Sequence, residues 1–244
     1  MSIEMKIEKT VEWLREKVNE AGAKGLIVGL SGGIDSSVVA FLMKKAFPDN
    51  SLGVIMPIHS HSNDQKDAEK LAIAANIEYH VVDLSNEHKS IKEKVLSEIN
   101  GEANERGADS NLRARLRMST IYTFANALNY LVVGTDNAAE TITGYFTKYG
   151  DGGVDILPIA RLTKREVYEW GEYLGVPKLI LDKAPSAGLW EGQTDEIEMG
   201  VTYDSIDDYI EGKEIDEKDR EIIERLNRIS EHKRKIPPMP PEYE

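Results

Sequence analysis

Apolar residues along this chain fall into two patterns, helical spacing and short continuous runs. Near the N-terminus, Ile7, Val11 and Leu14 recur at intervals of four and three residues. This spacing places them on one face of a helix, so we expect an amphipathic helix at 5–21. The run GLIVGL at 25–30 is instead almost wholly apolar, which is typical of a strand buried on both faces of a sheet.

The same two patterns alternate through the first two thirds of the chain. The expected strands lie at 25–30, 51–58, 77–84 and 130–135, with a short fifth strand within 155–162. The further helices are expected at 36–47, 63–76, about 87–99, 111–129 and 163–175. The weakly patterned stretch 100–110 predicts a loop. Alternation of strands and helices indicates an α/β fold with a parallel, doubly wound sheet and helices on both faces.

The C-terminal third has a different composition. A stretch rich in glycine, proline and threonine covers 182–203, and an acidic helix is expected at 216–234. The tail PPMPPEYE at 237–244 holds too many prolines for regular structure. We therefore expect a single domain over 1–244 that carries a lid and a helical appendage at about 182–244.

Composition and charge exclude several classes of function. The chain has 244 residues, 41% of them hydrophobic, and a formal net charge of −13. A chain of this length builds one sizeable core. Its acidic balance disfavours binding to nucleic acid or to a membrane surface, although a local basic pocket for a small anion remains compatible with it.

The absence of cysteine narrows the chemistry further. Because the sequence holds no cysteine, disulfides, thiolate zinc sites and cysteine nucleophiles are excluded. The N-terminus shows no basic region followed by an apolar one, and no apolar run approaches the ~20 residues that span a membrane. We therefore expect a non-secreted, cytoplasmic protein.

The turn GLSGGIDSS at 29–37 concentrates the candidate chemistry. It follows the first buried strand, at the sheet edge where open α/β proteins bind their ligands. Its glycines let the backbone approach a phosphate closely, and its serines add hydroxyl donors. The next helix directs its free N–H groups to the same place. The turn is therefore predicted to cradle an anion.

Asp35 within this turn decides the kind of cradle. The turn matches neither the lysine-containing Walker A loop nor the G-x-G-x-x-G dinucleotide fingerprint. A carboxylate inside a phosphate cradle repels the ligand unless a divalent cation lies between them, so Asp35 predicts Mg²⁺ with a polyphosphate. The alternative is a glycine turn whose aspartate only caps the helix.

The motif SGGIDSS resembles the S-G-G-x-D-S-[ST] pyrophosphate loop of the ATP pyrophosphatase (PP-loop) superfamily, whose enzymes adenylate a substrate oxygen. Five further blocks, in order, resemble those of the NAD⁺ synthetases. They are VGTDNAAE (133–140), GYFTKYGDGGVDILPI (144–159), LTKREVYEWGEYLGVP (162–177), PSAGLWEGQTDE (185–196) and EHKRKIPPMPP (231–241). The resemblance covers almost the whole chain and implies a Rossmann-like fold of the adenine nucleotide alpha hydrolase type.

The resemblance assigns roles around ATP. It implies that Asp35 and Glu140 bind Mg²⁺, and that Lys164 contacts the phosphates of ATP and acts in catalysis. A lysine there offsets negative charge when a carboxylate meets the α-phosphate. The implied ATP contacts are Gly29, Leu30, Ser31, Gly32, Gly33, Ile34, Asp35, Ser36, Thr135, Lys164 and Ser186. The family often has threonine at the position of Ser186, which keeps the hydroxyl.

The second substrate implied by the resemblance is deamido-NAD⁺. Its implied contacts are Arg115, Lys148, Asp155, His232 and Lys233, the last two acting across the interface of a homodimer. Asp151 is placed near the ammonia, where a carboxylate attracts ammonium and removes its proton.

The implied reaction has two steps. The nicotinate carboxylate attacks the α-phosphate of ATP, which releases pyrophosphate, and ammonia then displaces AMP to give NAD⁺. Because the chain has no cysteine for a glutaminase, we expect it to use free ammonia. Two alternatives stay open: another PP-loop synthetase, such as a GMP synthetase-like or tRNA-modifying enzyme, and a non-catalytic nucleotide-binding protein.

Overall fold

The computed structural model describes residues 1–59, 62–183 and 194–242. Its sheet has four parallel strands in the order β3-β2-β1-β4. Their bounds are β1 Gly25–Gly29, β2 Ser51–Ile55, β3 Glu78–Val81 and β4 Tyr130–Val132. The chain moves outward from β1 through β2 to β3 and then returns to the other side of β1. This reversal places the topological switch point between β1 and β4, where such sheets bind ligands.

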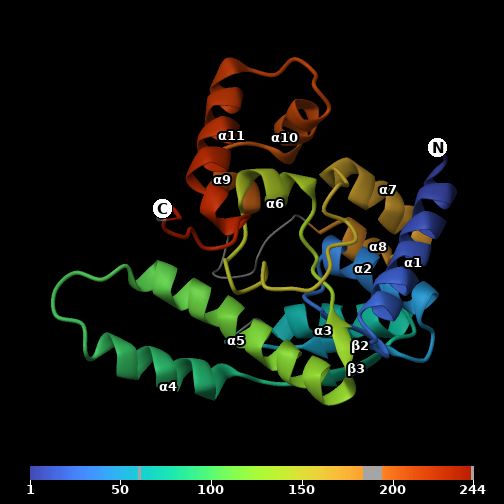
Figure 1. Cartoon of the computed structure of the whole chain (residues 1–244), viewed down its shortest axis with the longest axis horizontal. Helices are drawn as coiled ribbons and strands as arrows, with labels where there is room; N and C mark the ends of the chain where they lie inside the picture. Colours follow the sequence, from blue (N-terminus) through green and yellow to red (C-terminus); the bar gives the residue numbers. More distant parts are fainter. Residues whose placement is uncertain (60–61, 184–193, 243–244) are drawn as a thin grey trace.

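Helices cover both faces of the sheet, because successive strand residues point to opposite sides. Leu26 and Val28 of β1 pack into a core shared with five helices, whereas Ile27 packs into a second core beneath α5. The five helices are α1 Ile3–Glu20, α2 Ile34–Ala46, α3 Ser62–Ala74, α7 Lys164–Leu174 and α8 Lys178–Leu181. On the other face, α4 Ser85–Leu96 lies along α5 Glu105–Leu128 (Figure 1). The predicted parallel, doubly wound α/β fold is confirmed.

The remaining helices gather around the short helix that follows β4. Ala139 of that helix shares a third apolar cluster with Tyr203, Ile206 and Ile223, and Figure 1 shows these elements stacked beyond the end of the sheet. Their bounds are α6 Ala138–Thr143, α9 Asp195–Met199, α10 Tyr203–Ile210, α11 Glu217–Ile229 and the 3₁₀ helix η1 Glu231–Lys233.

Two predicted elements differ from the structure. The stretch expected as a loop at 100–110 is helical from Glu105, because Asn104 caps α5 by accepting a 2.9 Å hydrogen bond from the backbone N–H of Gly107. The fifth strand is reduced to one parallel bridge, between Val133 and Ile156. The turns around this bridge leave too little extended backbone for a ladder.

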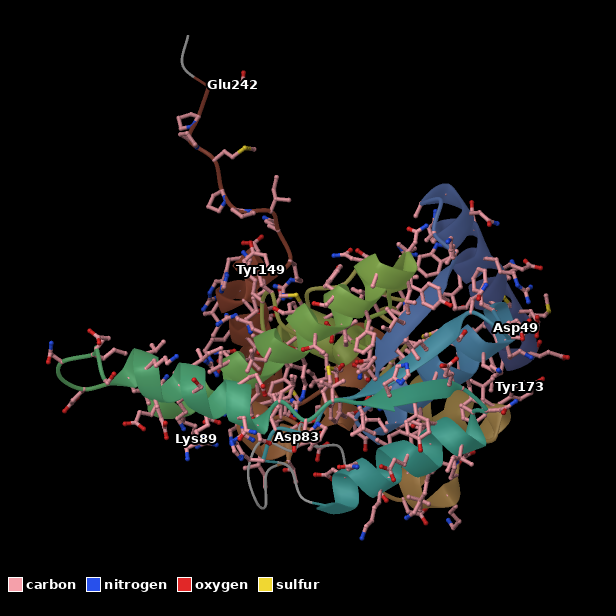
Figure 2. The ribbon with its side chains drawn as sticks, turned by 90° about the horizontal axis from the view of Figure 1, so that it is seen from below. Asp49, Asp83, Lys89, Tyr149, Tyr173 and Glu242 are labelled. Atoms are coloured by element: carbon pink, nitrogen blue, oxygen red, sulfur yellow. The ribbon has the colours of Figure 1, made fainter. Side chains whose placement is uncertain are left out.

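The C-terminal third is more helical than its composition predicts. Within 182–203 the short helix α9 begins at a Thr194 cap, and α10 follows a Thr202 cap. The acidic helix ends at Ile229 rather than continuing to 234. The tail is irregular through Glu242 and extends away from the body of the molecule (Figure 2). None of the helices within the described ranges combines the length and apolar character needed to cross a membrane.

Candidate active site

The turn between β1 and α2 is shaped by its serines and glycines. The Ser31 hydroxyl accepts a 3.2 Å hydrogen bond from the N–H of Gly33, and the Ser36 and Ser37 hydroxyls both donate to the Gly33 carbonyl. Gly32 has a φ of +77°, and a β-carbon there would lie 3.0 Å from the backbone nitrogen of Ala68. Only glycine fits this combination of backbone conformation and close approach.

The turn leaves the first N–H groups of α2 available. Gly33 is the N-cap of this 13-residue helix and supplies no side-chain cap. The unpaired N–H groups and the positive end of the helix dipole therefore face the turn, as they do in phosphate-binding loops.

A cavity of about 390 Å³ opens directly over this turn. Its walls come from the turn, the ends of β2 and β4, α3, α5, the 145–154 loop and the start of α7. The predicted residues that line it are Gly29, Leu30, Ser31, Gly33, Ile34, Asp35, Ser36, Thr135, Glu140, Asp151 and Lys164. The fold thus brings together residues from four separate sequence blocks at the switch point of the sheet.

Lys164 joins the two carboxylates that the sequence links to a metal. Its Nζ lies 2.7 Å from Oδ2 of Asp35 and 3.8 Å from Oε1 of Glu140. It also lies 4.7 Å from the centre of the Tyr203 ring. Only 3% of Lys164 is exposed, so its charge is shielded from bulk water and interacts strongly with its neighbours.

The start of α7 fixes the position of this lysine. Thr163 and Glu166 form a capping box at the first turn. The buried carboxylate of Asp207 accepts hydrogen bonds of 3.0 and 2.9 Å from the backbone N–H groups of Lys164 and Arg165. Helix α10 therefore holds the N-terminus of α7 and aims Lys164 at the cavity.

Asn137 is a residue of this site that the sequence did not single out. Its side-chain amide donates to Oδ1 of Asp35 at 2.9 Å. Its backbone and side chain also form a reciprocal capping box with Glu140 at the start of α6. The N-x-x-E spacing within GTDNAAE is a capping signal that reveals this role.

Burial and charge shift the protonation of the cluster. Burial, followed by the negative charge of Asp35, raises the pKa of Glu140 to about 8. Burial alone would lower the pKa of Lys164, but the carboxylates of Asp35 and Glu140 outweigh it and raise that pKa. Burial is also the main cause of the raised pKa of Tyr203. The cluster has one ammonium group for two carboxyl groups. Lys164 therefore keeps its charge, and Glu140 binds a proton more readily than an ordinary glutamate does.

This donor set fits a hard divalent cation. In residues 1–59, 62–183 and 194–242, no group of three or more His, Asp or Glu side chains is arranged to hold a metal alone. Asp35 and Glu140 nevertheless share one cationic neighbour, the Lys164 ammonium, which marks a point where positive charge is favoured. Mg²⁺ is commonly bound by one or two carboxylates and completes its shell with phosphate oxygens and water.

Asp151 lies in the 145–154 loop, open to the cavity. Its Oδ1 accepts a 2.8 Å hydrogen bond from the backbone N–H of Thr147. Although Asp151 is exposed by surface area, protein surrounds it because that surface faces the cavity. This environment raises its pKa, mainly by desolvation. A second carboxylate, Asp136, and the guanidinium of Arg117 line the same cavity, and the sequence motifs flagged neither.

The residues predicted to contact deamido-NAD⁺ divide into two places. Lys148 donates from Nζ to the carbonyl of His232 at 2.5 Å, and Arg115 reaches the carbonyl of Lys148 at 3.4 Å. Lys233 lies beside them and donates to the carbonyls of Gly144 and Phe146. The Arg115, Lys148 and Lys233 side chains thus form a basic group where α5, the 145–154 loop and η1 meet, and His232 joins it through its backbone carbonyl.

Asp155 lies apart from this group. Its carboxylate accepts hydrogen bonds from the Tyr122 hydroxyl at 2.9 Å and from the Val132 backbone at 2.8 Å. Both carboxylate oxygens are thus engaged within the chain. Ser186 and the central part of the predicted lid lie outside the described residues.

Comparison with known families decides among the chemistries that this cavity allows. The sequence profile of the NAD synthase family matches residues 6–238. This chain belongs to the NAD synthase family. A curated NH₃-dependent NAD⁺ synthetase of Alkaliphilus metalliredigens is 63% identical to this chain over 245 residues, which cover 98% of the chain and 99% of the relative.

Solved structures agree with this assignment. An NMN synthetase from Francisella tularensis is 43% identical to this chain, with a TM-score of 0.93 and coverage of 98% and 99% of the two chains. An NH₃-dependent NAD synthetase from Campylobacter jejuni is 28% identical, with a TM-score of 0.79 and coverage of 99% and 100%. The chain therefore belongs to a family of C–N bond-forming ligases and has the predicted Rossmann-like fold.

Proposed function

We propose that this protein amidates deamido-NAD⁺ with free ammonia, in a reaction driven by cleavage of ATP to AMP and pyrophosphate. The observation that carries the proposal is the convergence of Asp35, Glu140 and Lys164 over an anion cradle at the sheet switch point. The near-complete match to curated NH₃-dependent NAD⁺ synthetases supports the choice of substrates.

Each part of the cavity has a task in the first step. The free N–H groups of α2 bind the β- and γ-phosphates, which leave together as pyrophosphate. The Ser36 and Ser37 hydroxyls hold the turn in shape by donating to the Gly33 carbonyl. Lys164 offsets the negative charge that develops when the nicotinate carboxylate approaches the α-phosphate. Asp35 and Glu140 would hold Mg²⁺, which supplies charge neutralisation at the phosphates when bound. Thr135, at the cavity wall, is positioned to contact ATP.

The second step is assigned to Asp151 of the cavity wall and to a basic group that lies outside the cavity lining. Asp151 attracts ammonium and accepts its proton, so that the nitrogen gains the lone pair needed to attack the adenylated carboxyl group. The basic group of Arg115, Lys148, His232 and Lys233 suits the diphosphate of deamido-NAD⁺. We assign His232 and Lys233 to binding across the interface of a homodimer.

A second substrate is favoured by one specific observation. The F. tularensis chain, whose TM-score is 0.93, is an NMN synthetase. Nicotinate mononucleotide carries the same nicotinate carboxylate as deamido-NAD⁺ but lacks the adenylate half. The activation and amidation steps are the same for both acids, so the choice between them depends on the pocket that holds the rest of the substrate.

ATP–pyrophosphate exchange tests the proposal. We expect Mg²⁺-dependent exchange with deamido-NAD⁺, little with xanthosine monophosphate and none without an acid substrate. Stronger exchange with nicotinate mononucleotide than with deamido-NAD⁺ would select the second candidate. Asp35→Ala should abolish exchange while preserving the far-ultraviolet circular dichroism spectrum. Exchange that is independent of both nicotinate substrates would rule the proposal out.

A further inference from the structure

Asp136 is a buried carboxyl group that faces the cavity without a partner. It follows Thr135 beyond the end of β4, is only 6% exposed and lines the cavity wall. Within the part of the chain that the structure describes, no group hydrogen-bonds its carboxyl oxygens. An unpaired buried carboxylate is costly, so this position calls for a bound cation or a proton.

The nearest charges define what Asp136 can bind. Burial, and after it the negative charges of Asp151, Glu140 and Asp35, raise the pKa of Asp136, while Lys233 lowers it. Burial also raises the pKa of Asp151, and the positive charges of Lys233 and Arg117 offset part of that rise. Both cations have other partners, since Lys233 donates to two carbonyl groups and Arg117 donates to the carbonyl of Met56.

We propose that Asp136 and Asp151 together form the ammonium subsite of the cavity. The inference rests on the proposed function and adds Asp136 to it. Asp136 and Asp151 line the same cavity, and the charge of Asp151 raises the pKa of Asp136. Two carboxyl groups that interact in this way in a site of low dielectric share one proton and one negative charge. A pair with a single negative charge matches a small monovalent cation, and the N–H groups of ammonium match its oxygen acceptors.

The proton balance follows from this arrangement. Ammonium gives one proton to the carboxyl pair and becomes ammonia. Its lone pair forms the bond to the carbonyl carbon of the adenylate, and the bond from that carbon to the phosphate oxygen breaks. AMP leaves with the electron pair of that bond, and the second proton of the nitrogen passes to water. The pair thus supplies the first deprotonation at the point of attack.

The variant Asp136→Asn tests the subsite, because it keeps the shape of the side chain and removes its charge. We expect the KM for total ammonium to rise about tenfold or more at neutral pH, as the loss of one opposite charge in a buried site predicts. ATP–pyrophosphate exchange without ammonium should stay within about twofold of the wild type. Hydroxylamine, which is neutral at this pH, should capture the adenylate equally well in both proteins.

Asp49→Asn is the matched control. It makes the same chemical change at an exposed position in the turn after α2 (Figure 2), outside the cavity lining, and should leave all three measurements unchanged. The subsite is wrong if Asp136→Asn shows the same ammonium KM as the wild type, or if it weakens exchange and amidation equally. Loss of exchange in the wild type would instead overturn the proposed function and the inference with it.

A measurement on the wild type covers the case in which Asp136→Asn does not fold. If the subsite binds ammonium, the KM for total ammonium should vary little between about pH 6.5 and pH 8.5, because most of the total is ammonium throughout that range. If the enzyme binds only free ammonia, that KM should fall about tenfold per pH unit. The second result would overturn the subsite.

Discussion

The side-chain amide of Asn137 donates a hydrogen bond of 2.9 Å to Asp35, a residue 102 positions earlier in the chain. The same asparagine caps α6 and receives the Glu140 carboxylate on its backbone N–H. Asn137 therefore holds both predicted metal ligands in place. Its side chain binds Asp35, and its backbone N–H binds Glu140.

Asn137→Ala should weaken both the fold and the use of Mg²⁺. Loss of the N-cap is expected to lower the free energy of unfolding by about 1 kcal/mol. Loss of the bond to Asp35 should raise the Mg²⁺ concentration needed for half-maximal exchange. Asn104→Ala is the control, because Asn104 caps α5 and not the helix that carries Glu140. It should lower the stability by a similar amount without changing the Mg²⁺ requirement. An unchanged Mg²⁺ requirement in Asn137→Ala would contradict the linking role.

Lys164→Met should abolish adenylation more strongly than it affects folding. The methionine fills a similar volume but leaves Asp35 and Glu140 facing each other without their shared ammonium. We expect exchange to fall about a hundredfold or more, the usual effect of removing a charge that stabilises a transition state. Lys178→Met, at a side chain that is 85% exposed, is the control. Exchange within about threefold of the wild type would show that Lys164 has only a structural role.

The raised pKa of Glu140 predicts that the free energy of unfolding of the metal-free protein falls as pH rises. Its pKa is about 8 in the folded state against an ordinary value of 4.5, so the folded state binds the extra proton between these values. Its contribution to stability is therefore lost progressively between about pH 4.5 and pH 8. Glu140→Gln should flatten this dependence in thermal melts with a chelator present. Equal slopes for the two proteins would refute the assignment.

Gly32→Ala should be markedly more destabilising than Gly22→Ala. Both glycines have positive φ, of 77° and 62°, but a β-carbon at Gly22 meets nothing within 4 Å, whereas at Gly32 it meets the backbone of α3. We expect about 1 kcal/mol for Gly22→Ala from its conformation and clearly more for Gly32→Ala. Urea unfolding measures both. Equal losses of unfolding free energy in the two variants would show that α3 shifts at little cost to make room for the added β-carbon.

Asp151→Asn should separate the two steps of the reaction. Asp151 is assigned to the ammonia step, whereas Lys164 is assigned to adenylation. Adenylate formation should therefore proceed in the variant, while capture of the adenylate by ammonia slows by about a hundredfold, the scale of general base catalysis. Exchange without ammonium and amidation with ammonium measure the steps separately. A parallel loss of both would remove Asp151 from the ammonia step.

Much of the architecture was predictable because it follows from local pattern. The apolar run before Gly29 and the helical spacing after Asp35 predicted β1, α2 and the cradle between them. The short helices α9 and α10 were missed because five and eight residues show too little periodicity, although their threonine caps were visible. The start of α5 was missed because polar residues precede its apolar face, and only the Asn104 cap marks it.

The sequence by itself determined the kind of chemistry, through a glycine- and serine-rich turn with one aspartate behind a buried strand. Only the tertiary structure showed how Lys164 is held there and added Asn137 and Asp136 to the site. These residues reach the cavity because parallel strands end at one sheet edge and α10 holds the start of α7. The contacts join residues 43 to 129 positions apart, which no local pattern encodes.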